Sequence, residues 1–147
     1  MLALEITNIK HLMNLLLKES VFNDFKVSKI MVDSFAHLEI EPTTGAEEGL
    51  QSYINWAELQ PFVLTFIKNS KAPPKKMKFV LGKFPTDIEG IQNASTLFIN
   101  ITFEAGKMQL SSGISAKTFS MDKNDTNLWD NWILGFLSQN NIEYIRL

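Results

Sequence analysis

The chain of 147 residues contains no cysteine and almost no arginine. The absence of cysteine excludes thiol nucleophiles, disulfides, iron–sulfur clusters and cysteine-based zinc sites. The scarcity of arginine argues against specific clamping of phosphate, because the guanidinium fork is well suited to bidentate contacts. A net charge of -2 and an isoelectric point of about 5.7 show no overall basic excess that would indicate nucleic acid, and they stay compatible with a local basic face.

Long apolar runs and a targeting leader are also lacking. No run approaches the ~20 apolar residues needed to span a bilayer. The N-terminal stretch MLALEITNIKHLM has no basic leader followed by an apolar run and a small-residue cleavage site, so we expect no signal peptide. Together with the absence of cysteine, these features predict a cytoplasmic protein that does not contact a membrane.

Catalytic constellations are not visible either. The two histidines, His11 and His37, fall in different elements and outside the usual metal-ligand spacings. Asp87 and Glu89 are close in sequence, but they fall in a polar loop where burial would not separate their pKa values. The serines around Gly113 lack the Gly-x-Ser-x-Gly context of a nucleophile elbow. We therefore predict no catalytic residue, metal ligand or cofactor, and we favour a non-enzymatic protein while leaving an enzyme open.

The clearest structural pattern that is present runs from Leu97 to Met121. Every second residue from Leu97 to Phe103 is apolar, which is the period of a strand with one buried face. Ala105-Gly106 offers a tight turn, because glycine adopts the positive φ that hairpin turns need. The alternation then returns, breaks at Ser111-Ser112-Gly113 and resumes over Lys117–Met121. This stretch predicts a meander of three strands.

Other segments supply further strands and three helices. Alternation or β-branched runs predict strands at residues 2–6, 25–32, 36–40, 50–54, 77–84 and 142–147. Apolar residues at helical spacing predict one helix over residues 9–17 and a very apolar one over residues 128–137. A middle helix has its apolar stripe at Leu59, Phe62, Val63, Phe66 and Ile67.

The start of the middle helix is harder to predict. Asn55 is a suitable cap, and Glu58 follows three residues later to complete a capping box. Pro61 is tolerated in a first turn but costs about 3 kcal/mol inside a helix. We therefore expect the regular helix to begin close to Pro61 or to kink there. A loop over residues 85–94 is expected to contain a helical turn near residues 87–92.

The resulting fold class is α+β, with mostly antiparallel sheets and three helices on one face. The length fits a single domain over residues 1–147. Residues 1–49 and 50–121 each read as a strand–helix–meander unit, and residues 122–147 add a helix and a strand. This outline indicates either an internal duplication or the recurrence of common α+β parts, and the residues do not decide between them.

The whole chain resembles a family of small bacterial proteins of unknown function. Those proteins open with a strand and a helix similar to LALEITNIKHLMNLLL, carry a middle element similar to WAELQPFVLTFIK, and end in similar hairpin and helix elements. The resemblance covers nearly the full length and implies no particular activity.

Two patches also resemble the DNA sliding clamp, the bacterial polymerase processivity factor. IMVDSFAHLEIEPTTG is similar to the hairpin after the first clamp helix, and INITFEAGKMQLSSGISAKTFSM is similar to a clamp stretch with an acidic–glycine turn. Clamp domains consist of two strand–helix–meander units, so the resemblance implies one clamp-like domain and a homo-oligomeric ring. Residues 77–94 and the helix over residues 128–137 have no counterpart in a minimal clamp domain.

Two groups of residues are candidates for binding. The first could face DNA phosphates from the helices, or could be an ordinary solvated helix surface; it comprises Lys10, Asn14, Lys18, Lys68 and Lys71. The second could anchor a partner or a second copy, or could pack as core; it comprises Trp129, Trp132 and Phe136.

Three functions follow from these candidates. We favour a non-enzymatic binding or assembly protein, in its specific form a clamp-like homo-oligomer with DNA or a protein as partner. The alternative is a small enzyme or ligand-binding domain whose pocket is built from loops such as Phe84–Ala94. The third is a protein-interaction module that uses the C-terminal aromatic helix.

Overall fold

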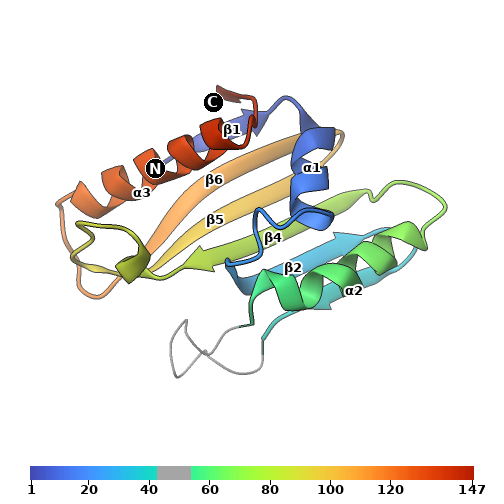
Figure 1. The fold of residues 1–147 in the computed structure, drawn as a ribbon, viewed down its shortest axis with the longest axis horizontal. Coiled ribbons are helices and arrows are strands. Elements are labelled where there is room, and N and C mark those ends of the chain that lie inside the picture. Colours follow the sequence, from blue (N-terminus) through green and yellow to red (C-terminus); the bar gives the residue numbers. More distant parts are fainter. Residues whose placement is uncertain (43–53) are drawn as a thin grey trace.

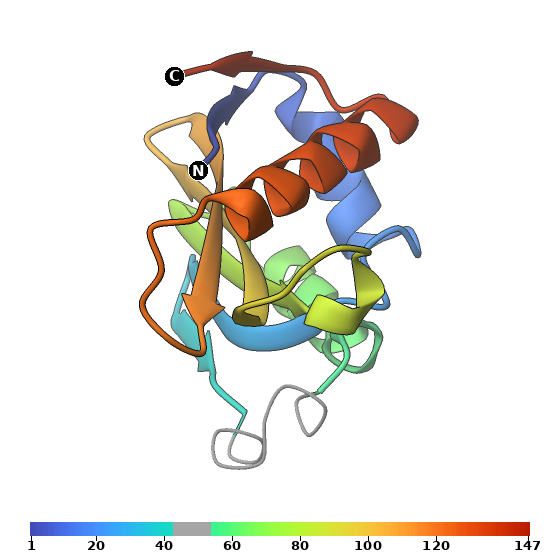
Figure 2. The same ribbon diagram turned by 90° about the vertical axis from the view of Figure 1, so that its left-hand side faces the viewer.

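The computed structural model describes residues 1–42 and 54–147 as one antiparallel sheet of seven strands with three helices on one face (Figure 1; Figure 2). The predicted α+β class with antiparallel pairing is thereby confirmed. The order in the sheet is β3-β2-β4-β5-β6-β1-β7. The strands are β1 (Ala3–Ile6), β2 (Lys26–Asp33), β3 (His37–Ile40), β4 (Lys76–Lys83), β5 (Ala94–Glu104), β6 (Lys107–Ala116) and β7 (Tyr144–Arg146). The helices are α1 (Ile9–Leu17), α2 (Trp56–Lys68) and α3 (Asn124–Gln139), with a short 3-10 turn η2 (Pro85–Asp87).

The hairpin of β5 and β6 corrects the predicted three-stranded meander. The turn is as predicted, with positive φ at Ala105 and Gly106. However, β6 continues through Ser111-Ser112-Gly113 to Ala116, and Lys117–Met121 is not a strand. Ala116 pairs with Ala94, where β5 begins, so the residues that follow have no strand left to pair with.

The start of α2 corrects a second prediction. The helix begins at Trp56, five residues before Pro61, and the backbone N–H of Asn55 donates to Glu58 Oε2 at 3.0 Å as the capping box requires. Pro61 lies in the second turn of the helix, and its missing N–H would have bonded the carbonyl of Ala57, an exposed residue. Phe62, predicted in the buried stripe, is 68% exposed.

One predicted strand falls mostly on residues that the structure does not describe. The predicted strand over residues 50–54 lies outside the described residues apart from Ile54, and so does most of the loop before it. Just after this segment, Asn55 makes an isolated antiparallel bridge with Lys26 of β2. The predicted turn in the loop after β4 is present as η2, slightly earlier than expected.

The core lies between the sheet and the three helices. Its largest fully buried side chains include Trp56 of α2 and Trp129 of α3, and the Trp56 ring meets Phe79 of β4 edge-on at 5.7 Å. Full burial of a side chain of this kind contributes on the order of 2 kcal/mol. Trp56 therefore anchors α2 on the strand beneath it.

The first strand joins the two predicted units. β1 pairs with β6 and β7 rather than with β2, the next strand of its own unit. The Leu147 N–H donates to Ala3 O at 3.0 Å, so the two ends of the chain lie close together (Figure 2). Both units thus contribute to one continuous sheet, and the duplication itself stays a prediction.

Candidate functional site

A mostly apolar groove lies between α1 and α2. Its volume is about 350 Å³. The two helices form its walls, β4 and β5 form its floor, and the loop after α2 completes it. The lining residues are Ile9, Met13, Asn14, Leu17, Lys18, Leu64, Ile67, Lys68, Pro73, Pro74, Met77 and Phe103.

The two helices are held together by side chains of α2. The indole N–H of Trp56 donates to Leu16 O at 2.8 Å. The Gln60 amide donates to Leu16 O at 2.9 Å and to Glu19 O at 2.7 Å. The last carbonyls of a helix lack hydrogen-bond partners within the helix. These donors therefore supply partners to backbone carbonyls at and just after the C-terminal end of α1. The relative position of the groove walls is thereby fixed near the C-terminus of α1.

The residues predicted to face nucleic acid are partly brought together here. Lys10 and Asn14 are exposed at successive turns of α1, and Lys18, the residue just after the helix, is exposed as well, as expected for one face. Asn14 and Lys18, together with Lys68, line the groove, whereas Lys10 does not. Lys71 is exposed and lines a separate hollow beside the β2–β3 turn.

His11, which lies beside this lysine face, has a structural contact. Its Nε2 lies 2.8 Å from the carbonyl oxygen of Asn140, just after α3. A carbonyl only accepts, so the ring donates from Nε2 in this contact. The Asn8 side chain also bridges the same ends, donating to Asn141 O and accepting from Glu143 N. These contacts attach the start of α1 to the end of α3.

The apolar half of the groove was not predicted. Ile9 and Met13 belong to the apolar stripe of α1, but they are only half-buried because α2 leaves space beside them. Leu64 lies outside the predicted stripe of α2. A helical stripe shows which side chains avoid water, but the gap between two helices depends on their packing, which no local pattern contains.

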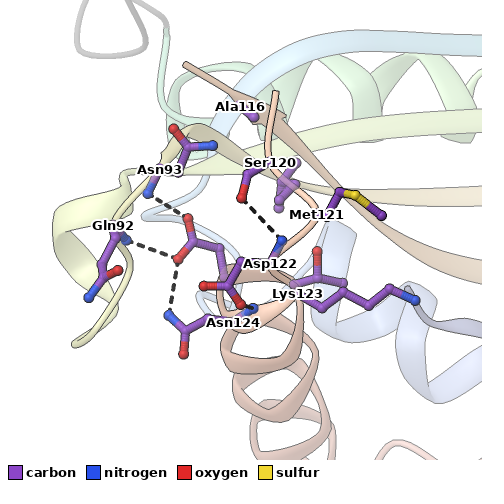
Figure 3. A pocket seen from close by; sticks show the side chains of 11 residues that line it. Gln92, Asn93, Ala116, Ser120, Met121, Asp122, Lys123 and Asn124 are labelled. Carbon is purple, nitrogen blue, oxygen red and sulfur yellow. Dashed lines mark hydrogen bonds between the residues drawn. The ribbon is translucent and has the colours of Figure 1, made fainter. Parts of the chain in front are cut away.

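A second hollow of about 360 Å³ lies where the β4–β5 loop meets the start of α3 (Figure 3). Beside it, the buried carboxylate of Asp125 accepts the backbone N–H groups of Gln92, Asn93 and Ala94 at 2.7–2.9 Å. The Asn124 side-chain amide adds a bond of 3.3 Å. This hollow corresponds in part to the loop-built pocket of the alternative hypothesis.

The environment of Asp125 stabilises its charge. Burial alone would raise the pKa of the Asp125 carboxyl, but the backbone N–H groups and the Asn124 amide outweigh it, so the pKa lies below its usual value. Both carboxylate oxygens already accept hydrogen bonds. The group is therefore a weak base with occupied acceptor sites, which fits a structural anchor better than a general base.

The aromatic residues of α3 form a stack that packs against the core. Trp129 is fully buried, and its indole N–H donates to Phe98 O at 2.8 Å. Trp132 stacks between Trp129 and Phe136, with ring centroids 5.3 Å apart on each side. Lys83 Nζ lies 5.5 Å from the centre of the Trp132 ring. Only Trp132 and Phe136 keep exposed surface, so they alone could still touch a partner in this conformation.

Within residues 1–42 and 54–147, no group of three or more histidine or acidic side chains is arranged to hold a metal ion. In the same ranges, no helix combines the length and the apolar character needed to cross a membrane.

The fold and the groove define an α+β protein with one antiparallel sheet and a helix-lined apolar hollow. The chain belongs to DUF5721, a family of unknown function, which it matches over residues 14–145. The predicted resemblance to a family of unknown function is confirmed. No curated protein and no solved structure matches the chain, so the likeness to the sliding clamp is not confirmed.

Proposed function

We propose that this protein is a non-enzymatic, cytoplasmic binding protein whose ligand occupies the groove between α1 and α2. The supporting observation is the lining of that groove, which combines a mostly apolar surface with a small number of polar groups. Small-molecule sites have this composition, and their volumes begin near ~300 Å³. The groove walls are also pre-positioned by Trp56 and Gln60.

The test uses 1-decanol, an uncharged apolar probe, and follows backbone NMR shifts of the full chain. Shifts that saturate and concentrate on the groove residues are expected. Leu64→Gln, which places an amide in the groove, should weaken the effect. Leu134→Gln is the matched control, because Leu134 is also half-buried but lies on α3 and does not line the groove. Absent shifts, or shifts spread over the whole sheet, would contradict the proposal.

A second candidate is retention of double-stranded DNA by a clamp-like homo-oligomer. The favouring observation is the line of exposed Lys10, Asn14 and Lys18 on α1, with Lys68 and Lys71 exposed at the end of α2. Phosphate contacts of this kind need no base readout and weaken as salt displaces them. The prediction is binding at 50 mM salt that falls steeply by 200 mM, with an oligomeric mass in light scattering. A monomer that fails to bind DNA at low salt would eliminate this candidate.

A further inference from the structure

The ionisable groups that line the groove are all cationic. Lys18 and Lys68 are among the lining residues, and no aspartate or glutamate is. The chain as a whole contains more acidic than basic residues, so this lining does not reflect the average composition. An anionic ligand would match the groove in charge, whereas a cationic one would not.

Within the described residues, neither Lys18 nor Lys68 forms an ion pair. Among residues 1–42 and 54–147, the ion pairs involve the N-terminus, Lys29 and His37. A lysine in the last turn of a helix often serves only to offset the helix dipole. Here the two lysines also border one apolar hollow from two different helices, which that role does not require.

The apolar part of the groove suits a flexible hydrocarbon chain. Its lining is mainly aliphatic, with Met13 and Met77 adding side chains that adapt to irregular shapes. The methylene stems of Lys18 and Lys68 extend apolar walls while their charged ends stay in water. A ligand with one apolar chain and one anionic end would satisfy both kinds of lining.

The size of the groove limits the length of that chain. At about 350 Å³ the groove lies at the small end of the range for small-molecule sites, which suits a chain of medium rather than great length. The groove therefore has the size of a small-molecule site.

We propose that the groove binds a free medium-chain fatty acid, with the chain along the apolar lining and the carboxylate near Lys18 and Lys68. This inference rests on the proposed function, because it names the ligand class of the same groove. It adds a requirement for negative charge that the proposed function does not contain.

The experiment is calorimetric titration of the full chain with decanoate, 1-decanol and decyltrimethylammonium, all below their aggregation limits. Decanoate should bind about tenfold more tightly than decanol, which is the effect expected of two partly exposed charge contacts. The cationic amphiphile should bind more weakly than decanol. Lys18→Gln/Lys68→Gln should remove the preference for decanoate over decanol, because it removes both positive charges from the groove.

Lys10→Gln/Lys71→Gln is the matched control, because it removes two exposed lysines that do not line the groove. This control should keep the preference, and thermal unfolding should show that both double variants fold. Equal binding of decanoate and decanol would overturn the fatty-acid inference and leave the proposed function standing. Binding of neither would overturn both. Retention on phosphatidylglycerol vesicles that competes with decanoate would overturn the inference in favour of a membrane surface.

Discussion

At the scale of single residues, Asp125 shows how an acidic side chain can serve the fold. In the structure it lies in the first turn of α3, where negative charge is favoured by the helix dipole. Its carboxylate accepts hydrogen bonds from three consecutive backbone N–H groups, which belong to Gln92, Asn93 and Ala94 at the start of β5. The residue therefore attaches α3 to the sheet at the start of β5.

We expect Asp125→Asn to lower the free energy of unfolding by about 2 kcal/mol at pH 7. The substituted amide keeps one acceptor oxygen but turns an N–H₂ group toward backbone donors, which leaves buried N–H groups without a partner. Urea unfolding of both proteins measures the difference. Glu89→Gln is the control, because Glu89 is an exposed carboxylate in the same loop and should change little.

The same residue predicts a pH dependence with a definite sign. The pKa of Asp125 is lower in the folded protein than the ~3.9 of an unfolded chain. Its contribution to stability is therefore fully present above about pH 4 and is lost as the pH falls through the lower, folded value. The stability difference between the native protein and Asp125→Asn should shrink in that acidic window. Unfolding curves that stay equally separated from pH 7 to pH 3 would contradict this assignment.

At the scale of elements, the junction of α1 and α2 depends on a few donors from α2. Gln60→Ala should reduce the free energy of unfolding by about 1 kcal/mol. The substitution removes the side-chain amide that donates to Glu19 O and to Leu16 O, and Leu16 O then keeps only the Trp56 indole N–H as a side-chain donor. Amide exchange should accelerate at the C-terminal end of α1. Thr65→Ala, at an exposed position of the same helix, should cause neither effect. Unchanged exchange in Gln60→Ala would mean that apolar packing alone holds the junction.

Elements were predictable where a local pattern decides the structure. The apolar spacing predicted all three helices, and the Ala105-Gly106 turn predicted the β5–β6 hairpin. The predicted strand at Lys117–Met121 failed because alternation alone does not supply a neighbouring strand. Phe119, the aromatic residue of that pattern, is instead 92% exposed. The expected start of α2 close to Pro61 was wrong, because the helix begins at Trp56, directly after the Asn55–Glu58 capping box.

The candidate site was predictable only in part, because a local pattern does not show how two helices distant in sequence pack together. The exposed row of Lys10, Asn14 and Lys18 follows from helical spacing alone. The contribution of Lys68 to the same groove follows from the packing of two helices that are distant in sequence. Aromatic content predicted a role for α3, but only the structure shows that Trp129 is buried and bonded to the sheet.

At the scale of the whole molecule, the sheet links the two predicted units more closely than a simple tandem would. β1 belongs to the first unit but bonds to β6 of the second, and β2 of the first bonds to β4 of the second. Leu4 and Ile6 of β1 are almost completely buried. Each unit therefore completes part of the core of the other.

This arrangement predicts that neither unit folds alone and that the two fold together. Separate fragments 1–49 and 50–147 should each lack dispersed amide NMR signals, because β1 has no neighbouring strand in the first fragment and β6 loses β1 in the second. An equimolar mixture should recover the spectrum of the full chain, since the pairing of β1 with β6 and of β2 with β4 needs no covalent link. The full chain at the same concentration is the reference. A native-like spectrum from 50–147 alone would show instead that the second unit, together with residues 122–147, folds independently and that β1 is an accessory strand.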